Sequence, residues 1–427
     1  MVGAGRRRTP GSSAGRNASS VPGERASWKA RGDDAVVFGP GDELSMTVCA
    51  WVAFLMLFYV YLGYFLLLKA IARNKRCDED DAREEEMEPW RWPRVSVLLT
   101  VYNEEDKIKK RIENILSCRY PRGLLEVLVA SDGSTDGTDS YVRALGDKRV
   151  RLYRPEKRVG KTDTQNQAVA GTDSEIIVFT DADTTFDPGF IEEIVRPFRQ
   201  KDVGGVDGHL LFTRCDGAVS ESQGFYWSLE LRIRSLESCL GWLAVGSGAC
   251  LAVRKSIFRP MVSTVGEDCL VPLDVVRQGY RMIHARNAIA YDRMPSDSRR
   301  EFRTRVRMTL RNWQGTWMYP DLLNPVRHPG TAFALWSHKL LRWMSPLFLL
   351  LWIGSGLPLL AYGEGVAAIP GWLALVFSGA AVMGWLVQKS SLDVPAVGFA
   401  YSFCLANLGM AVGVIRALSG RQITTYR

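Results

Sequence analysis

The chain has 427 residues, of which 47% are hydrophobic and 23% charged, and its formal net charge is +8. This length suits one large domain with added elements or two to three ordinary domains. Basic residues can indicate nucleic-acid binding, but here they lie beside apolar segments and within 293–311, and no DNA- or RNA-binding motif is visible. We therefore expect a membrane surface or an anionic substrate as their partner, and no nucleic acid.

The first element predicted along the chain is a transmembrane helix. Residues 45–68 carry no charge and are too many for the apolar core of a signal peptide, and residues 1–44 before them are rich in Gly, Ser and Arg. Lys69, Arg73 and Lys75 follow the helix, so the positive-inside rule places the next segment in the cytoplasm. Residues 78–88 contain eight acids in eleven positions, which indicates a solvated linker.

From Val95 onward, short apolar runs alternate with amphipathic stretches. The pattern predicts strands over 95–101, 125–130, 149–153 and 175–180, and helices over 106–116, 135–145 and 161–170. Alternation of this kind is typical of an α/β domain with a mostly parallel sheet and right-handed crossovers.

Polar residues follow three of these strands. Tyr102 and Glu104 follow the first strand, Asp132 the second, and Asp181-Ala182-Asp183 the last. Strand ends of a parallel sheet meet at one edge, where open α/β folds bind ligands. Two carboxylates two residues apart point to the same face of an extended segment and suit Mg²⁺ or Mn²⁺ held jointly with substrate phosphates. A solvated turn is the alternative for that motif alone, but together the strand ends predict a nucleotide site.

Lys161 begins the helix predicted over 161–170. Gly160-Lys161-Thr162 is similar to the end of a Walker A loop, which needs a glycine five positions before Gly160 so that backbone amides can approach phosphates. Position 155 is proline, which lacks an amide proton. A P-loop ATPase is therefore not expected, and a surface lysine is the structural alternative.

Taken in order, these motifs resemble the family 2 glycosyltransferases of GT-A fold over residues 93–340. The segments that carry the resemblance are 95–105, 131–138, 160–161, 180–183, Glu267-Asp268 with Gly279-Tyr280-Arg281, and 303–315. Spans before and after the domain resemble the membrane-embedded branch that makes polysaccharides or glycolipids, including the poly-N-acetylglucosamine synthases. The resemblance implies a GT-A nucleotide-sugar-binding domain inserted between transmembrane helices.

The resemblance also implies roles for individual residues. Tyr102, Glu104 and Asp132 would bind the nucleotide, and Lys161 would reach the base or the diphosphate. Asp181 and Asp183 would hold the sugar nucleotide and its Mg²⁺ or Mn²⁺, with Asp183 the surer metal ligand. Gly248 would contact the substrate, and Asp268, next to Glu267, would be the general base. An acid pair at a helix N-terminus is the structural alternative for Glu267-Asp268.

The segment 308–315 departs from the pattern of the processive relatives, which carry Gln-x-x-Arg-Trp. Arg311 is kept, but the first glutamine is missing, Asn312 stands in place of the tryptophan, and Trp313 comes one residue later. By resemblance Arg311 would stabilise the leaving diphosphate, and Trp313 and Gln314 would contact substrate. The alternative is a basic helix on anionic lipid. Processivity is left open.

Three more charge-free segments follow, at 343–363, 365–388 and 394–415. Three spans would place Arg416 and Arg421 outside, against the positive-inside rule. Either 394–415 lies flat at the cytoplasmic face or re-enters, or the rule fails here. The expected organisation is a disordered tail (1–44), a transmembrane helix (45–70), an acidic linker (71–92), a cytoplasmic GT-A domain (93–320), an interfacial segment (321–342), two to three transmembrane or interfacial helices (343–418) and a C-terminal tail (419–427).

The sequence as a whole predicts a multi-pass protein of the cell membrane, of the bacterial inner-membrane kind. We expect an inverting glycosyltransferase that uses a nucleotide diphosphate sugar, most plausibly a UDP-sugar, and a polysaccharide or lipid-linked acceptor, with export or synthase subunits as further partners. One alternative is a single-transfer enzyme that acts on a lipid carrier. Another is an inactive synthase subunit, which the presence of Asp132, Asp183 and Asp268 argues against.

Overall fold

The computed structural model describes residues 40–75, 90–213, 218–293, 298–387 and 395–422. Most of the predicted tail at 1–44 and most of the acidic linker at 71–92 lie outside these residues, as does the end of the C-terminal tail at 419–427. The strands and helices predicted between 95 and 180 are all present, with small differences at their ends.

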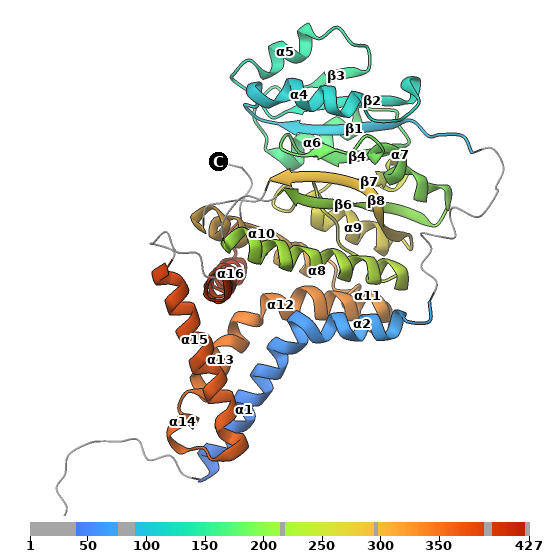
Figure 1. The fold of residues 1–427 in the computed structure, drawn as a ribbon. Coiled ribbons are helices and arrows are strands. Elements are labelled where there is room, and N and C mark those ends of the chain that lie inside the picture. Colours follow the sequence, from blue (N-terminus) through green and yellow to red (C-terminus); the bar gives the residue numbers. More distant parts are fainter. Residues whose placement is uncertain (1–39, 76–89, 214–217, 294–297, 388–394, 423–427) are drawn as a thin grey trace, which may run out of the picture.

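An eight-stranded sheet forms the centre of the α/β domain (Figure 1), in the order β3-β2-β1-β4-β7-β6-β8-β5. Neighbours among β1 to β4 are parallel, and so are β6 and β8. The sheet is mostly parallel, as predicted, and the two exceptions are β7, which runs antiparallel to β4 and β6, and β5, which runs antiparallel to β8. The strands are β1 Val95–Val101, β2 Leu125–Ser131, β3 Val150–Tyr153, β4 Ile176–Thr180, β5 Thr185–Phe186, β6 Val203–Thr213, β7 Leu251–Arg254 and β8 Arg281–Arg293.

The sheet is buried on both faces because alternate residues of its inner strands enter two different cores. In β4, Ile176 and Val178 belong to one core, and Ile177 and Phe179 to the other. The first core includes residues of α4 (Glu105–Leu116) and α7 (Phe190–Val195), and α5 (Thr138–Ala144) adds Val142 to it. The second core includes residues of α6 (Lys161–Ala170) and α9 (Glu267–Arg277). Each fully buried aliphatic side chain contributes about 1.5–3 kcal/mol of transfer free energy.

A layer of helices lies under the sheet, and a second group extends away from it (Figure 1). The layer contains α2 (Tyr64–Ala72), α8 (Ala218–Leu240), α10 (Ser298–Trp317), α11 (Pro329–Ala334), α12 (Leu341–Trp343) and α16 (Pro395–Leu418). The extending group contains α1 (Pro40–Phe58), α13 (Ser345–Gly356), α14 (Leu359–Tyr362) and α15 (Ile369–Val387). Two π-helical segments connect these helices, η1 (Tyr59–Gly63) and η5 (Leu335–Leu340). Short 3-10 turns lie at η2 (Arg122–Leu124), η3 (Arg196–Arg199), η4 (Lys255–Ile257) and η6 (Gly365–Ala368).

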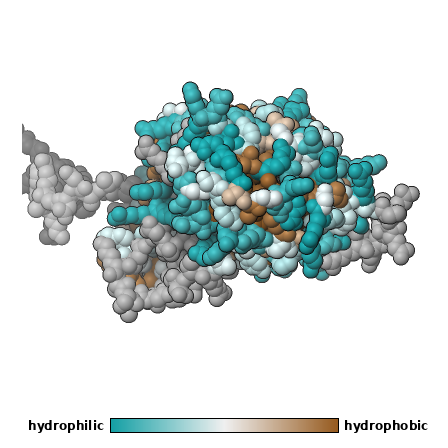
Figure 2. Space-filling view, turned by 90° about the horizontal axis from the view of Figure 1, so that it is seen from above, coloured by the Kyte–Doolittle hydropathy of each residue, from teal (hydrophilic) through white to brown (hydrophobic). Residues whose placement is uncertain are grey.

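Among the described residues, three helices are long and apolar enough to cross a membrane, namely 41–72, 365–387 and 396–418. The span predicted at 343–363 belongs instead to a helix pair, 329–343 and 345–361, that is bent by 55°. Large apolar side chains are exposed on α1, α13 and α15, for example Val52, Leu350 and Val376. By contrast, the outer face of the α/β domain is mostly hydrophilic, with apolar patches near its middle (Figure 2).

Helix α16 differs in direction from the other two candidates. It is seen end-on in Figure 1, whereas α1 and α15 run down the picture, so α16 crosses them. Two glycines let it approach α10 closely: a Cβ at Gly413 would lie 2.7 Å from Cβ of Thr309, and one at Gly409 would lie 2.9 Å from Cβ of Arg305. Of the placements left open for 394–415, this direction resembles a helix lying flat.

A buried network of charged side chains joins the α/β domain to the helices beneath it. Glu230 of α8 is 3.1 Å from Arg234, and Arg234 is 3.2 Å from Asp207 of β6. Asp207 accepts a hydrogen bond of 2.8 Å from the backbone N–H of Ser247. On its other side Glu230 has two partners in η5 and α12, His338 at 2.9 Å and Arg342 at 2.7 Å. The loop around Ser247 is therefore tied to the helices beneath the sheet, through η5 and α12.

Candidate active site

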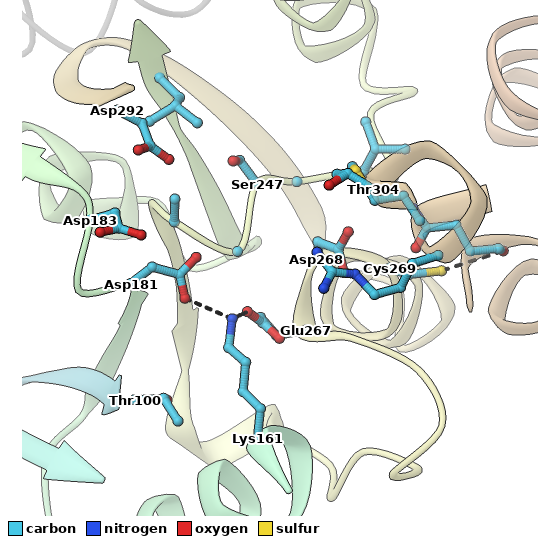
Figure 3. A pocket seen from close by; sticks show the side chains of 18 of the residues that line it. Thr100, Lys161, Asp181, Asp183, Ser247, Glu267, Asp268, Cys269, Asp292 and Thr304 are labelled. Carbon is cyan, nitrogen blue, oxygen red and sulfur yellow. Dashed lines mark hydrogen bonds and ion pairs between the residues drawn. The ribbon is translucent and has the colours of Figure 1, made fainter. Parts of the chain in front are cut away.

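A pocket of about 690 Å³ opens at the carboxyl ends of β1, β2 and β4 (Figure 3). Helices α8 and α10, η5 and the loop 244–249 complete its walls. Most of the predicted site residues line it, and these are Tyr102, Glu104, Asp132, Lys161, Asp181, Asp183, Gly248, Glu267 and Asp268. Three predicted residues do not line it, namely Arg311, Trp313 and Gln314.

Asp132 follows β2 and holds the loop that leads into α6. Its Oδ1 accepts hydrogen bonds of 2.9 Å from the backbone N–H groups of Val159 and Gly160, and one of 3.1 Å from Thr164. Gly160 has a φ of 96°, a conformation that favours glycine. Asp132 therefore shapes the start of α6, and its predicted contact with the nucleotide stays a prediction.

Tyr102 and Glu104 lie on the loop after β1. The guanidinium carbon of Arg158 is 3.7 Å from the centre of the Tyr102 ring and thus stacks on it. The side chain of Asn103 ties this loop to the β2 loop by accepting a hydrogen bond of 2.8 Å from the backbone N–H of Thr135. Glu104 pairs with Lys107 at 2.9 Å. An aromatic face and a guanidinium therefore stand together where a base would stack.

Lys161 is the first residue of α6 and bridges two of the predicted acids. Its Nζ is 2.7 Å from Oδ1 of Asp181 and 2.7 Å from Oε1 of Glu267 (Figure 3). The ammonium group is largely buried between them, because only 17% of the side chain is exposed. Lys161 is therefore a pocket residue and not the surface lysine of the structural alternative.

Three carboxylates gather at the edge of the pocket: Asp181, Asp183 and Asp292, the last from the end of β8 (Figure 3). Burial, joined by the charges of Asp181 and Asp183 and opposed by a backbone hydrogen bond from Arg293, raises the pKa of Asp292 to about 6. Lys107 is 2.7 Å from Asp183, and its hydrogen bonds to Asp183 and Glu104 raise the pKa of the lysine. The negative charge is thus only partly neutralised by side chains.

This edge fits a divalent metal ion shared with a substrate. Among the described residues, no group of three or more His, Cys, Asp or Glu side chains is arranged to hold a metal by itself. Clustered carboxylates favour an added cation, and Mg²⁺ is commonly held by one or two carboxylates plus substrate phosphates. Asp181 and Asp183 are the residues that would hold it, with Asp292 beside them.

Glu267 and Asp268 begin α9 and have opposite electrostatic surroundings. Burial raises the pKa of Glu267, but the charge and hydrogen bond of Lys161 outweigh burial and leave this pKa lowered. Burial and the charge of Glu267 raise the pKa of Asp268, and the charges of Arg311 and Lys161 reduce that rise. Glu267 is therefore the ionised partner of Lys161, and Asp268 is the carboxylate more ready to take a proton.

Gly248 allows Glu267 to reach this position. A Cβ at residue 248 would collide with the carboxylate of Glu267. The neighbouring Ser247 is held by Asp207, as described above. The loop 246–248 thus forms a fixed wall of the pocket. Where this wall lies closest to Glu267, only glycine fits.

The predicted residues of α10 lie behind the pocket. Arg311 is buried, with Nε 3.1 Å from the carbonyl oxygen of Thr264 and Nη2 3.2 Å from Oγ1 of Thr162. Trp313 packs against Trp317 and Trp343, and Gln314 donates to the carbonyl oxygen of Arg421 at 2.8 Å. Asn312, Thr316 and Trp343 line the pocket instead. The substrate contacts of Arg311, Trp313 and Gln314 stay predictions.

Several pocket residues were missed by sequence reasoning. Asp292 follows the rule of a polar residue at a strand end, but β8 was not predicted as a strand. Arg158 carries no motif, since it is one of many basic residues, and the same holds for Lys107, which does not line the pocket but pairs with Asp183. Arg111 supports the site from below, because its buried guanidinium donates to Thr180 Oγ1 at 2.6 Å and to the Asp181 carbonyl oxygen at 3.2 Å.

Comparison with known proteins agrees with this geometry. Residues 96–261 match the family described as glycosyl transferase family 2. The N-acetylglucosaminyltransferase of Azorhizobium caulinodans is 23% identical over 241 residues, which are 52% of this chain and 61% of that protein. The probable glycosyltransferase YdaM of Bacillus subtilis is 24% identical over 61% of this chain and 64% of its own. The chain thus spans less than two thirds of these relatives.

One relative is more similar over a shorter region. The beta-monoglucosyldiacylglycerol synthase of a Nostoc strain is 35% identical over 175 residues, which are 38% of this chain and 36% of that protein. Among solved structures, the mannosyltransferase PcManGT from Pyrobaculum calidifontis, in complex with GDP-Man and Mn²⁺, has a TM-score of 0.67 at 22% identity. It covers 88% of this chain and 100% of its own, so the folds are alike.

The sheet of this chain therefore has the fold of the solved mannosyltransferase, which is the GT-A fold. Residues 96–261, the part that matches the family described as glycosyl transferase family 2, contain most of that sheet and its acidic edge.

Proposed function

We propose that the protein is an inverting glycosyltransferase of the cell membrane. It would move a sugar from a nucleotide diphosphate sugar, a UDP-sugar first of all, to a growing polysaccharide or a lipid-linked saccharide. The observation that carries this proposal is the convergence of Asp181, Asp183 and Asp268 on one pocket at the carboxyl edge of the sheet. Such a pocket offers acids for diphosphate and metal together with a separate carboxylate for proton transfer.

In this proposal Asp268 is the general base. It accepts the proton of the acceptor hydroxyl while that oxygen forms a bond to the anomeric carbon and the bond to the nucleoside diphosphate breaks. Attack from the side opposite the leaving group inverts the configuration. The raised pKa of Asp268 supports this role, because a base needs a pKa near the working pH. Glu267 would stay ionised and keep Lys161 in place.

On the donor side, Lys161 would face the diphosphate as a point charge, Lys107 would stay paired with Asp183, and Tyr102 with Arg158 would stack on the base. Asp181 and Asp183 would hold Mg²⁺ or Mn²⁺, which neutralises charge on the leaving diphosphate when bound. Arg311 is held by hydrogen bonds to Thr162 and Thr264, and from that position it would act on Asp268, the proposed general base.

The relatives guide the choice of donor. The name N-acetylglucosaminyltransferase recurs among them, as in the proteins of Azorhizobium caulinodans and Rhizobium meliloti. UDP-N-acetylglucosamine is therefore the first donor to test, and an exopolysaccharide the first product to seek.

We further propose that the long apolar helices anchor the protein in a membrane of the bacterial inner-membrane kind, with the α/β domain in the cytoplasm. The supporting features are the three candidate spans and the basic residues Lys69, Arg73 and Lys75 at the domain side of the first. A polymer product would need export or synthase subunits as partners.

A second candidate, single transfer onto a lipid carrier, is favoured by a separate cavity. This cavity of about 300 Å³ lies between α1, α8, α10, α15 and α16 and has an almost wholly apolar lining that includes Phe54, Trp352 and Phe403. Arg305 and Arg342 also line it. Each arginine is paired with a carboxylate, Arg305 with Glu301 and Arg342 with Glu230, so the cavity matches an apolar chain. An inactive synthase subunit is disfavoured, because Asp132, Asp183 and Asp268 all line the catalytic pocket.

The experiment that tests the proposal offers labelled UDP-N-acetylglucosamine, UDP-glucose and GDP-mannose to the purified full-length protein in lipid vesicles, with Mn²⁺, with Mg²⁺ or with chelator. Products are separated by size and by extraction into organic solvent. A long polymer indicates a synthase, and a single labelled lipid indicates the second candidate. No transfer from any sugar nucleotide to any acceptor, by protein that still binds the donor, would contradict both.

A further inference from the structure

A groove on the outer side of α10 is lined by four arginines. Arg299, Arg303 and Arg307 are four residues apart and therefore lie on one face of that helix, and Arg416 comes from α16. Arg299, Arg303 and Arg416 are exposed. The groove has a volume of about 560 Å³.

The floor and rim of the same groove are apolar. Phe302 and Val306 contribute from α10, and Tyr401, Leu405 and Leu408 from α16. Leu408 is 56% exposed, although it sits beside charged side chains. Positive charge next to an open apolar surface matches an amphiphile with an anionic head and does not match a freely soluble anion.

Glu301, the acidic residue in the first turn of α10, faces away from this groove. Glu301 is buried and is 2.6 Å from Arg305, and both line the apolar cavity on the other side of α10. Helix α10 thus separates a neutral ion pair on one side from the arginine groove on the other. Because α16 is one of the helices apolar enough for a membrane, the groove lies where head groups would stand in the proposed orientation.

We propose that the arginine groove between α10 and α16 binds the phosphate of an anionic membrane phospholipid, with the acyl chains against Leu405 and Leu408. The lipid is a bound ligand and not the acceptor. Arginine side chains suit phosphate oxygens because their guanidinium groups donate two parallel hydrogen bonds. This proposal rests on the proposed membrane placement of α16.

The groove also reaches the active site. Arg307 lines both the groove and the catalytic pocket, and Arg311 follows one helical turn later. A phosphate held in the groove would fix α10 against α16 and so hold Arg307 at the wall of the pocket. Transfer is therefore expected to depend on anionic lipid.

The test uses the full-length protein reconstituted in vesicles of phosphatidylcholine alone or with about 20% phosphatidylglycerol, a content that gives an anionic surface. Phosphatidylglycerol retained after detergent exchange is measured by native mass spectrometry, and sugar transfer is measured separately. We expect selective retention by wild type. The triple variant Arg299→Gln, Arg303→Gln, Arg416→Gln should bind phosphatidylglycerol at least about tenfold more weakly.

The matched control is the triple variant Lys69→Gln, Arg73→Gln, Lys75→Gln. It removes three exposed cations at the domain end of α2 and leaves the groove intact. Its retention should equal that of wild type, and an equal loss in both triple variants would overturn the groove in favour of diffuse surface charge. Arg303→Lys keeps the charge at this position. The unfolding midpoint is recorded for each variant, so that weaker lipid binding can be told apart from loss of folding.

Two further arms identify the source of the phosphate. Soluble glycerol phosphate at matched concentration should not displace the lipid, and complete displacement would mean a site for free anions. Transfer of labelled sugar onto phosphatidylglycerol would also overturn the proposal, because the lipid would then be an acceptor. Retention is independent of turnover, so failure of the proposed catalytic function would leave the lipid measurement interpretable.

Discussion

Glu267 and Asp268 are adjacent, and the ammonium group of Lys161 is 2.7 Å from the carboxylate of Glu267. Lys161 holds Glu267 in its ionised form, and the charge of Glu267 then raises the pKa of Asp268. Two neighbouring carboxylates, one with a lowered and one with a raised pKa, commonly supply one fixed charge and one proton acceptor. Here Lys161 is the side chain that lowers the pKa of Glu267.

We predict that Asp268→Asn lowers the rate of sugar transfer at least about a hundredfold, as expected for loss of a general base. In wild type the base must be ionised, and its pKa is raised, so activity should fall as pH drops through a value above the ordinary range of aspartate. The pH–rate profile checks both points. Asp173→Asn, an exposed acid outside the pocket, is the control. A transfer rate in Asp268→Asn equal to wild type would remove Asp268 from the mechanism.

A second prediction concerns Gly248. Gly248→Ala should displace the Glu267 carboxylate, break its pair with Lys161 and reduce transfer, while the protein stays folded. Gly224→Ala is the matched control, since no atom lies within 4 Å of the added Cβ and alanine in a helix is favoured over glycine by about 1 kcal/mol. Kinetics and unfolding midpoints of both variants are compared. Unchanged kinetics in Gly248→Ala would mean that Glu267 can move without consequence.

Sequence reasoning found the acids that follow β1, β2 and β4 because each stands at the end of a recognisable apolar run. It missed Asp292 because β8 mixes Arg, His and Asn with apolar residues and does not read as a strand. The predicted substrate contacts of Trp313 and Gln314 stay predictions, although neither residue lines the pocket. A helix turns by about 100° per residue, so with Asn312 facing the pocket the next two side chains point elsewhere. Rotation of a helix about its axis is set by packing, which single motifs do not report.

At the scale of elements, α16 depends on two small residues. Gly409 and Gly413 permit the close contact with α10, in the manner of small residues at helix crossings in membranes. The hydropathy of 394–415 predicted a helix but not its direction, because an apolar helix at a domain surface and one across a bilayer have similar composition.

We predict that Gly413→Leu destabilises the protein by roughly 1–3 kcal/mol, the usual cost of overpacking. The added side chain would meet Thr309 and the backbone of Val306. Thermal unfolding in detergent checks the shift. Gly379→Leu on α15, where nothing lies within 4 Å of the added Cβ, should leave the midpoint nearly unchanged. Equal shifts in the two variants would show that α16 is not tightly packed on α10.

For the whole molecule, the Glu230 network is the main polar connection described between the catalytic domain and the helices beneath it. Its members are buried, so each charge relies on its partners rather than on water. No sequence motif indicated this network, because its residues lie on separate helices and strands. Hydrophobic patterning predicts layers, whereas the pairs that join layers depend on three-dimensional placement.

Removing one partner should therefore be costly. We predict that Glu230→Ala destabilises the protein by roughly 3–5 kcal/mol, because buried Arg342 would lose its carboxylate partner and buried Arg234 would keep only Asp207. The matched control is Glu192→Ala, which breaks a partly exposed pair with Arg196 and should cost at most about 1 kcal/mol. Unfolding midpoints measured in the same detergent decide, and similar costs for the two variants would contradict the network's structural importance.

The same network has a consequence for how the protein is made. Glu230 is separated from His338 by 108 residues and from Arg342 by 112, so the ribosome completes α8 long before its partners exist. Until those residues emerge, Glu230 lacks its partners in η5 and α12, although Arg234 of its own helix is already present. We therefore expect the sheet, whose last strand ends at Arg293, to form before the C-terminal helices pack against it. A chain ended after residue 320 should remain protease-sensitive around α8 even though its sheet is complete.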